Sequence, residues 1–208
     1  MATVSARPPR RTQAERSAST RTKLLDATVA CLLEVGYARV TTTEIAERAG
    51  VSRGAQLHHF PTKAELVLTA VEHLFERRIT EFKSAFAGLP AGVDRAAVAV
   101  DLLWSMVSGP TFYAALELIV AARTDAELHR SVTAFSDRLY TTVDRTFAEL
   151  FPIPANVQHL YRGTATFALV LMEGLALAKI VSTDDERFRR VLDSLKLLAR
   201  ITIPPDPS

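Results

Sequence analysis

Apolar residues recur along this chain at intervals of three and four positions, which is the spacing of one face of an α-helix. The first such segment places Leu24, Ala27, Thr28 and Cys31 on one face. The sequence has no run of β-branched residues bounded by hairpin turns, so strands are not indicated. The pattern therefore predicts an all-α protein.

Local signals set the expected ends of the N-terminal helices. Thr41 with Glu44 has the spacing of a capping box, and Ser52 is a good N-cap. Gly36 and Gly50 each follow the last apolar position of a helix, where glycine commonly ends it. The expected spans are 20–34, 41–50, 52–60 and 62–86.

A segment rich in glycine and proline at residues 88–92 is the clearest break in the helical pattern. Five further helices are expected beyond it. Thr183 with Glu186 is predicted to form the capping box of the last one, and the proline-rich segment 204–208 cannot continue a helix. The expected spans are 94–108, 111–122, 125–150, 155–181 and 184–201.

The composition excludes several classes of protein. The chain has 208 residues, 48% of them hydrophobic, and a formal net charge of +2, which does not fit a disordered chain. Cys31 is the one cysteine, so an internal disulfide and a multi-cysteine metal site are excluded and a reducing, cytoplasmic location is favoured. The longest apolar stretch expected, 102–116, is interrupted by Gly109, so no membrane span is expected.

The small net charge conceals a division between the two ends of the chain. Residues 1–67 hold 10 basic and 6 acidic residues, a net of +4, whereas residues 68–208 hold 15 basic and 17 acidic residues, a net of −2. The excess indicates a nucleic acid or another anionic partner at the N-terminal end, where a flexible basic tail is expected over residues 1–19. The basic residues of this tail and of the segment just beyond it are Arg7, Arg10, Arg11, Arg16, Arg21 and Lys23.

Residues 41–60 have the organisation of a helix-turn-helix, in which the second helix enters the major groove of DNA. Gly50 supplies the left-handed backbone conformation that the turn requires. Ser52 satisfies the first amides of the second helix, and the small Gly54 and Ala55 allow close approach to bases or phosphates. Eight residues at 1.5 Å each give a helix of about 12 Å, about the width of the major groove.

The segment Thr43-Glu-Ile-Ala-Glu-Arg-Ala-Gly-Val-Ser-Arg-Gly-Ala55, followed by His59-Phe60 and by Thr62-Lys-Ala-Glu-Leu66, resembles the tetracycline-repressor (TetR) family of bacterial transcriptional regulators. The resemblance covers roughly residues 20–67. It implies a DNA-binding domain there, a helical domain for effector binding and dimerisation over 68–203, and a homodimer. Residues 204–208 are then a flexible C-terminus.

The resemblance also assigns candidate DNA contacts. Thr41, Thr42 and Thr43 correspond to the cap of the second helix and its phosphate contacts, and His59 and Lys63 to further phosphate contacts. A guanidinium can bridge guanine O6 and N7, so an arginine at the start of the recognition helix is the best candidate for a base contact. That arginine is Arg53. The candidates on or beside the recognition helix, Arg53 included, are Ser52, Arg53, Gly54, Ala55, Gln56 and His58.

The chain departs from the family pattern at Gln56 and Leu57, where an apolar residue and a tyrosine are usual. Leu57 lacks the hydroxyl that reaches a phosphate in the family. Gln56 either replaces that contact, reads an adenine edge, or is exposed to solvent.

The C-terminal domain offers candidates for effector binding but no enzymatic constellation. The histidines lack metal-ligand spacing, and a phosphate loop and a nucleophile elbow are missing from the sequence, so neither a cofactor, a metal nor catalysis is expected. Glu117 and Glu173 lie among apolar neighbours, where a carboxylate either orients a ligand or pairs with a cation such as Arg123 or Arg162. The candidate effector residues, which ordinary core packing also explains, are Trp104, Phe112, Tyr113, Glu117, Phe167 and Glu173.

The last two expected helices carry broad apolar stripes. By the resemblance they pair with a second copy in a four-helix bundle, which presents two recognition helices to a palindromic operator. The chain is thus predicted to be a DNA-binding regulator, most often a repressor in such families, released from DNA by a small molecule. The alternative is a helical ligand-binding or dimerisation protein that has lost specific DNA binding, which only Leu57 favours.

Overall fold

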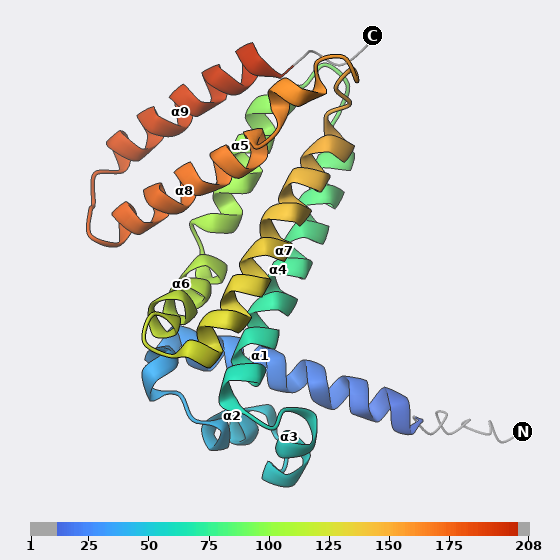
Figure 1. Ribbon diagram of the computed structural model, residues 1–208, viewed down its shortest axis with the longest axis vertical. Helices are drawn as coiled ribbons and strands as arrows, with labels where there is room; N and C mark the ends of the chain where they lie inside the picture. The colour runs from blue at the N-terminus through green and yellow to red at the C-terminus, as the bar shows by residue number, and fades with distance from the viewer. Residues whose placement is uncertain (1–11, 204–208) are drawn as a thin grey trace, which may run out of the picture. The chain divides into compact units, whose positions relative to one another are not determined.

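The computed structural model describes residues 12–203, and within that range the regular structure is entirely helical (Figure 1). The predicted all-α class is confirmed. Residues 1–11, with Arg7, Arg10 and Arg11 of the predicted tail, and residues 204–208 lie outside the described part. The α-helices are α1 (Gln13–Arg39), α2 (Thr42–Ala49), α3 (Arg53–His59), α4 (Lys63–Ala87), α5 (Arg95–Val107), α6 (Pro110–Ala122), α7 (Ala126–Leu150), α8 (Thr164–Ile180) and α9 (Asp185–Thr202), with a 3-10 helix η1 (Gln158–Tyr161).

The chain divides into two compact units, residues 1–70 and 71–208, with the division inside α4. In the first unit the beginning of α4 joins α1, α2 and α3 around one core. Its largest buried side chains belong to all four helices and the segments beside them: Leu24, Val40, Ile45, Gln56, Phe60, Leu66 and Val67. This core fixes the orientation of α2 and α3 in the first unit.

α1 is longer than its sequence predicted. It begins at Gln13, because Thr12 and Glu15 form a capping box that satisfies the first free amides, so residues 13–19 of the expected flexible tail are helical. Gly36 interrupts the helix as expected, with φ 74°, but a last turn follows it to Arg39.

The second unit is built around α5, which packs against both α8 and α9. Val100 and Val107 of α5 form one buried cluster with Leu169 and Met172 of α8 and with Leu195 of α9. α4 and α7 also pack together along their length, since the rings of Phe75 and Phe135 lie 5.4 Å apart and Lys83 donates to Glu149 over 2.6 Å. Figure 1 shows α8 and α9 running side by side beyond α5.

Two expectations for the C-terminal helices are wrong. The single helix expected over 155–181 is broken at Gly163, whose φ of 78° is left-handed, so η1 precedes a shorter α8. The last helix is capped by Asp184, which accepts from the amide of Arg187, and not by Thr183. At Gly163 one residue with a strong local preference outweighs the periodic pattern around it, and at the last helix an aspartate one position later is the cap in place of the threonine.

The longest apolar helical stretch is also not the one expected. Among the described residues, Gln158–Ile180 is long and apolar enough to cross a membrane by length and composition, with 22% of its most apolar window buried. α5 and α6 pass the same test as a pair but bend by 55°. Core helices of soluble proteins meet these criteria too, so the finding marks α8 as unusually apolar and no more.

Candidate nucleic-acid interface and ligand cavities

α3 has one buried and one exposed face. Gln56 and Phe60 point into the core of the first unit, whereas Arg53, Gly54, Leu57 and His58 are exposed. Positions four apart lie next to each other on a helix, so Arg53 adjoins Leu57 and Gly54 adjoins His58. The exposed face therefore carries the Arg53 guanidinium and the His58 imidazole, with a gap at Gly54 between them. Its one large apolar side chain is Leu57, which is 46% exposed.

The turn before α3 has the predicted geometry. Gly50 has φ 63° and ψ 36°, and its amide donates to the end of α2, so the left-handed residue ends that helix. The Ser52 hydroxyl then accepts from the amide of Ala55 over 3.2 Å, which confirms the predicted cap. These local contacts place Arg53 at the first turn of α3.

The three threonines before and within α2 have different roles. The Thr41 hydroxyl accepts from the amide of Glu44, and the Glu44 carboxylate accepts from the Thr41 amide and hydroxyl, so the predicted capping box is confirmed. These hydrogen bonds from Thr41 lower the pKa of Glu44. Thr43 is exposed and Thr42 is half-buried, which leaves hydroxyls at the N-terminus of α2 near the surface.

Gln56 is placed differently from all three expectations, the phosphate contact, the adenine contact and exposure to solvent. Its side chain is completely buried, and its Nε2 donates to the Phe60 carbonyl over 2.8 Å. The exposed interpretation is wrong, and a side chain in this position presents no edge to an adenine. The reason is that Gln56 lies on the same face of α3 as Phe60, four residues on, and its amide satisfies the carbonyl that the end of the helix leaves free.

Lys63, at the start of α4, contacts the end of α1. Its Nζ donates to the Tyr37 carbonyl over 2.6 Å and lies 4.4 Å from the centre of the Tyr37 ring. Partial burial lowers the pKa of the ammonium. Tyr37 lies in the last turn of α1, which leaves its carbonyl without a donor in the helix, so the lysine has a structural partner in addition to any phosphate.

The second unit contains a cavity of about 320 Å³ between α4, α5, α6, α7 and α8. Its walls are mainly apolar and aromatic, with Phe75, Phe112 and Phe135 among them. Ser136, Tyr140 and Glu173 supply its polar side, where the tyrosine hydroxyl donates to the carboxylate over a long 3.4 Å. Burial raises the pKa of Glu173, and burial together with the nearby carboxylate raises the pKa of Tyr140.

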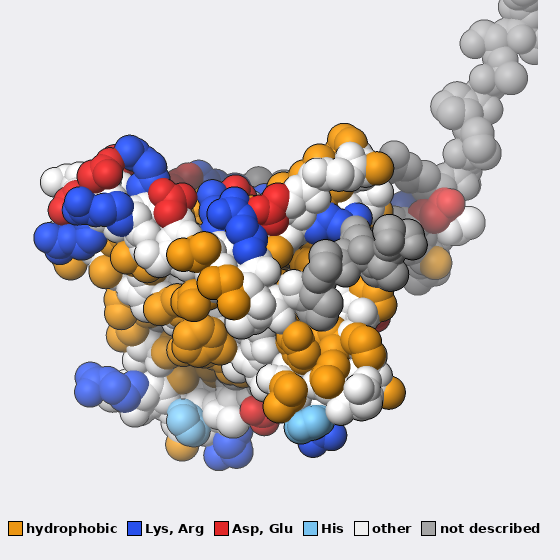
Figure 2. All heavy atoms as spheres, turned by 90° about the horizontal axis from the view of Figure 1, so that it is seen from above, with side chains coloured by type: hydrophobic (Ala, Val, Ile, Leu, Met, Phe, Trp, Pro, Cys, Tyr) orange, Lys and Arg blue, Asp and Glu red, His pale blue; other side chains and the backbone are white. Residues whose placement is uncertain are grey.

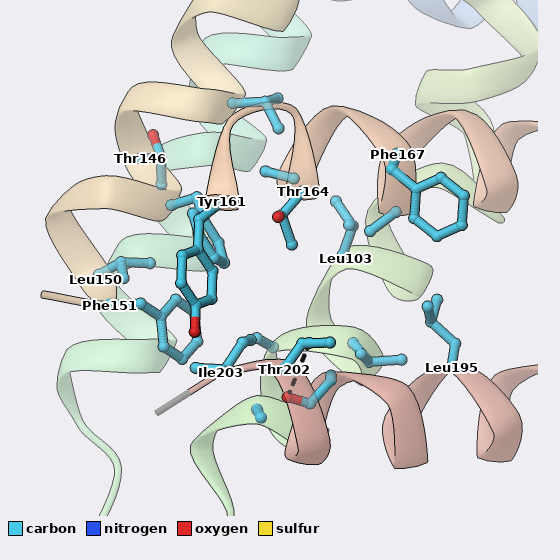
Figure 3. A pocket seen from close by; sticks show the side chains of 18 of the residues that line it. Leu103, Thr146, Leu150, Phe151, Tyr161, Thr164, Phe167, Leu195, Thr202 and Ile203 are labelled. Carbon is cyan, nitrogen blue, oxygen red and sulfur yellow. Dashed lines mark hydrogen bonds between the residues drawn. The ribbon is translucent and has the colours of Figure 1, made fainter. Parts of the chain in front are cut away.

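A larger cavity of about 770 Å³ lies between the far ends of α4, α5 and α7 and the inner sides of α8 and α9 (Figure 3). Figure 3 shows Phe151 and Tyr161 together at one end and Phe167 at the other, with Leu103 between them. Phe167 is 60% exposed, so this cavity is open at the surface of α8. Its few polar side chains are Thr146, Tyr161, Arg162, Thr164 and Thr202.

The family described as "Bacterial regulatory proteins, tetR family" matches residues 24–70, which contain the helix-turn-helix. Over 197 residues the chain is 35% identical to the HTH-type transcriptional regulator CymR of Pseudomonas putida, covering 93% of this chain and 95% of that protein. The chain belongs to the TetR family. It is a DNA-binding transcriptional regulator whose N-terminal helix-turn-helix and all-α C-terminal part follow the family's organisation.

More distant proteins agree with this TetR-family assignment. The chain is 27% identical over 160 residues to the HTH-type transcriptional regulator BetI of Burkholderia thailandensis, covering 76% of this chain and 80% of that one. A transcriptional regulator from Rhodococcus sp. Rha1 shares the fold, with a TM-score of 0.65, 22% identity, and 90% and 99% of the two chains covered. A solved regulator from Streptomyces coelicolor A3(2) gives a TM-score of 0.63 at 26% identity, with 88% and 98% covered.

The six candidate effector residues of this TetR-family protein are not brought together. Phe112 and Glu173 line the smaller cavity and Phe167 lines the larger one. Glu117 is exposed and lies outside both, so its expected apolar setting is wrong: of its apolar neighbours in sequence Leu118 is buried, whereas Ile119 and Val120 are exposed as Glu117 is. The two remaining candidates, Trp104 and Tyr113, line neither cavity.

Sequence reasoning missed the polar partner of Glu173. Tyr140 lies 33 residues away on α7, and no local pattern links the two positions. The expected ion pair with Arg123 or Arg162 is not found, since among residues 12–203 no cation pairs with Glu173, whose carboxylate accepts from the Tyr140 hydroxyl. The cavity therefore contains a carboxylate without a compensating positive charge in its walls.

Proposed function

We propose that this TetR-family regulator is a homodimeric repressor that binds a palindromic operator through α3 and leaves it when a small molecule binds the second unit. The observation that carries the DNA-binding part is the exposed face of α3, where Arg53 stands on a short helix fixed by the Ser52 cap and the Gly50 turn. In this proposal the protein acts in the cytoplasm and catalyses no reaction.

The chemistry of α3 supports specific base contacts. The Arg53 guanidinium suits the two acceptors of a guanine, and the exposed Leu57, in place of a phosphate-binding tyrosine, suits the methyl group of a thymine. Gly54 and Ala55 leave room for the DNA backbone, and His58 lies beside Gly54 on the same face.

Phosphate contacts would come from groups around α3. The hydroxyls of Thr42, Thr43 and Ser52 lie at helix N-termini, where amide groups and the helix dipole favour an anion. His59 is half-buried beside Phe60. Lys63 gives one of its three donors to the Tyr37 carbonyl, which leaves two for a phosphate.

Dimerisation is supported by the apolar surface of α8 and α9. Large hydrophobic side chains exposed on these two helices are Phe167, Val170, Leu171, Leu177, Ile180, Leu197, Leu198 and Ile201. Figure 2 shows hydrophobic side chains gathered over the middle of the face seen from above, with charged side chains along its upper and lower margins. A second copy pairing these helices would bury this surface in a four-helix bundle and explain why α8 is so apolar.

Release by an effector is supported by the helices that line the smaller cavity. α4 lines it through Phe75 and also begins in the first unit, so a ligand that favours one position of α4 changes the preferred position of α3. Coupling of this kind is reciprocal and typically changes affinity about 5–150-fold.

The proposal is tested by fluorescence anisotropy with a labelled duplex from the region upstream of the protein's own gene. The wild type is expected to bind with an affinity that falls steeply as salt rises. Arg53→Ala should weaken binding by roughly 1–3 kcal/mol, or about 5–150-fold, with no change in thermal stability. Arg130→Ala is the matched control, because Arg130 is an exposed arginine of the second unit on α7.

The alternative function, a regulator that has lost specific DNA binding, predicts another result. Arg53→Ala and Arg130→Ala would then weaken binding equally and slightly, because only the overall charge would matter. Salt-sensitive binding with no preference between the upstream duplex and a scrambled duplex would contradict the repressor proposal.

A further inference from the structure

The smaller cavity of the second unit has an uneven charge. Of the seventeen residues that line it, Glu173 and Tyr140 are the titratable ones, and the walls contain no lysine, arginine or histidine. A carboxylate removed from water is costly to ionise unless a positive charge compensates it. The protein does not supply that charge within the described residues, so a ligand is the natural source.

The rest of the cavity is suited to an aromatic or aliphatic body. Phe75 and Phe135 lie 5.4 Å apart at an angle of 50°, and Phe112 joins them in the wall. The faces of aromatic rings carry partial negative charge and attract cations within about 6 Å. Rings and carboxylate thus favour the same sign of charge.

The geometry points to a small organic cation as the ligand of this cavity, with its ammonium group against Glu173 and Tyr140 and its apolar body against Phe75, Phe112 and Phe135. This inference rests on the proposed role of the second unit as the effector domain, and it adds the chemical class of the effector. At about 320 Å³ the cavity admits a molecule with one ring and a short chain.

Glu173 and Tyr140 act together in this arrangement. The tyrosine hydroxyl donates to one carboxylate oxygen and holds the group in place, while the carboxylate accepts from the ammonium. An anionic ligand would meet Glu173 with no cation in the walls to offset the repulsion, so the cavity discriminates against acids of the same size.

Three compounds of similar size and different charge test the inference: 2-phenylethylamine, 2-phenylethanol and phenylacetate. Binding to the full-length protein is measured at neutral pH by isothermal titration calorimetry. The amine is expected to bind at least tenfold more tightly than the alcohol, and phenylacetate more weakly than both. Glu173→Gln should remove the advantage of the amine and leave the alcohol unchanged, because the amide keeps the shape and loses the charge.

Glu76→Gln is the matched control, since Glu76 is an exposed carboxylate on α4 next to the cavity residue Phe75. It is expected to bind all three compounds as the wild type does. The inference is overturned if phenylacetate binds as tightly as the amine, if none of the three binds, or if Glu173→Gln keeps the preference for the amine.

Operator binding by the same preparations separates this inference from the proposed function. A protein that binds its operator duplex but shows no preference for the amine contradicts the inference of a cationic ligand and leaves the repressor proposal intact. A protein that binds the amine through Glu173 and shows no sequence-specific DNA binding contradicts the repressor proposal and supports the inference on the cavity.

Discussion

The exposed face of α3 and the exposed faces of α8 and α9 are both at the surface, but they differ in chemistry. α3 presents Arg53 and His58 around small residues, with Leu57 as its single large apolar side chain. α8 and α9 present large apolar side chains in series, with Val170, Leu171 and Leu197 each more than a third exposed. Polar groups around a gap suit the grooves of DNA, whereas a continuous apolar surface suits another apolar surface.

Burial also distinguishes residues of α3 that look equally suited to DNA in the sequence. Gln56 and Arg53 are neighbours on the same short helix, and both are chemically able to read a base. In the structure the first is completely buried and the second is exposed. A residue can therefore be assigned to DNA contact only when its side chain is both chemically suited to a base and exposed.

The largest expected effect comes from placing a charge on the apolar surface of α8. Leu171→Asp should weaken dimerisation by roughly 3 kcal/mol or more, at least about 150-fold, because the carboxylate would be buried without a partner in the pair. Analytical ultracentrifugation measures the change. Val120→Asp is the control, since Val120 on α6 is also a well-exposed apolar residue and lies outside both cavities. Equal effects of the two substitutions would show that α8 has no special part in the dimer.

A smaller effect is expected at Gln56. Gln56→Ala should reduce the free energy of unfolding by about 2 kcal/mol, because it removes a buried hydrogen bond and leaves the Phe60 carbonyl without its donor. Thermal denaturation measures the loss, and Gln13→Ala, an exposed position of α1, is the control. A variant with unchanged stability and altered base preference would instead make Gln56 a DNA-reading residue.

The smallest effect concerns pH and Glu173. Burial raises its pKa above the ordinary 4.5, so the folded protein holds this proton more tightly than the unfolded chain does. The stabilising contribution of the protonated group is complete below pH 4.5 and is lost as the pH rises through the raised value. Glu173→Gln avoids the loss, so its melting temperature should exceed that of the wild type by an amount that grows above pH 4.5.

This difference should stay below about 4 °C, the shift that 1 kcal/mol produces in a chain of this length, because Glu173 is only partly buried. Glu76→Gln, with its exposed carboxylate, should show no such dependence on pH. A melting temperature for Glu173→Gln that falls below that of the wild type as the pH rises would mean that the ionised carboxylate is stabilised by the protein.

The features that the sequence predicted well are those set by residues close together in the chain. The box of Thr41 and Glu44, the turn at Gly50 and the cap at Ser52 each span four residues or fewer, so their geometry follows from local chemistry. The spacing of apolar residues was enough to predict the all-α class and the approximate spans of α2, α3, α6 and α7.

The features that the sequence did not predict depend on contacts between distant residues. Lys63 meets a carbonyl 26 positions earlier, and Tyr140 meets Glu173 33 positions later, and neither spacing has a local signature. Glu117 and Glu173 both have apolar neighbours in sequence, and only the packing of α6 and α8 decides that the first is exposed and the second faces a cavity.

Hydroxyl-radical footprinting of the wild type on its upstream duplex tests the central claim most directly, because it reports both regions in one experiment. In the proposed dimer α8 and α9 pair with a second copy, and each chain exposes one α3. The footprint should then show two protected half-sites related by a two-fold axis, about 10 base pairs or a multiple of that apart. A single protected segment without two-fold symmetry would contradict the account.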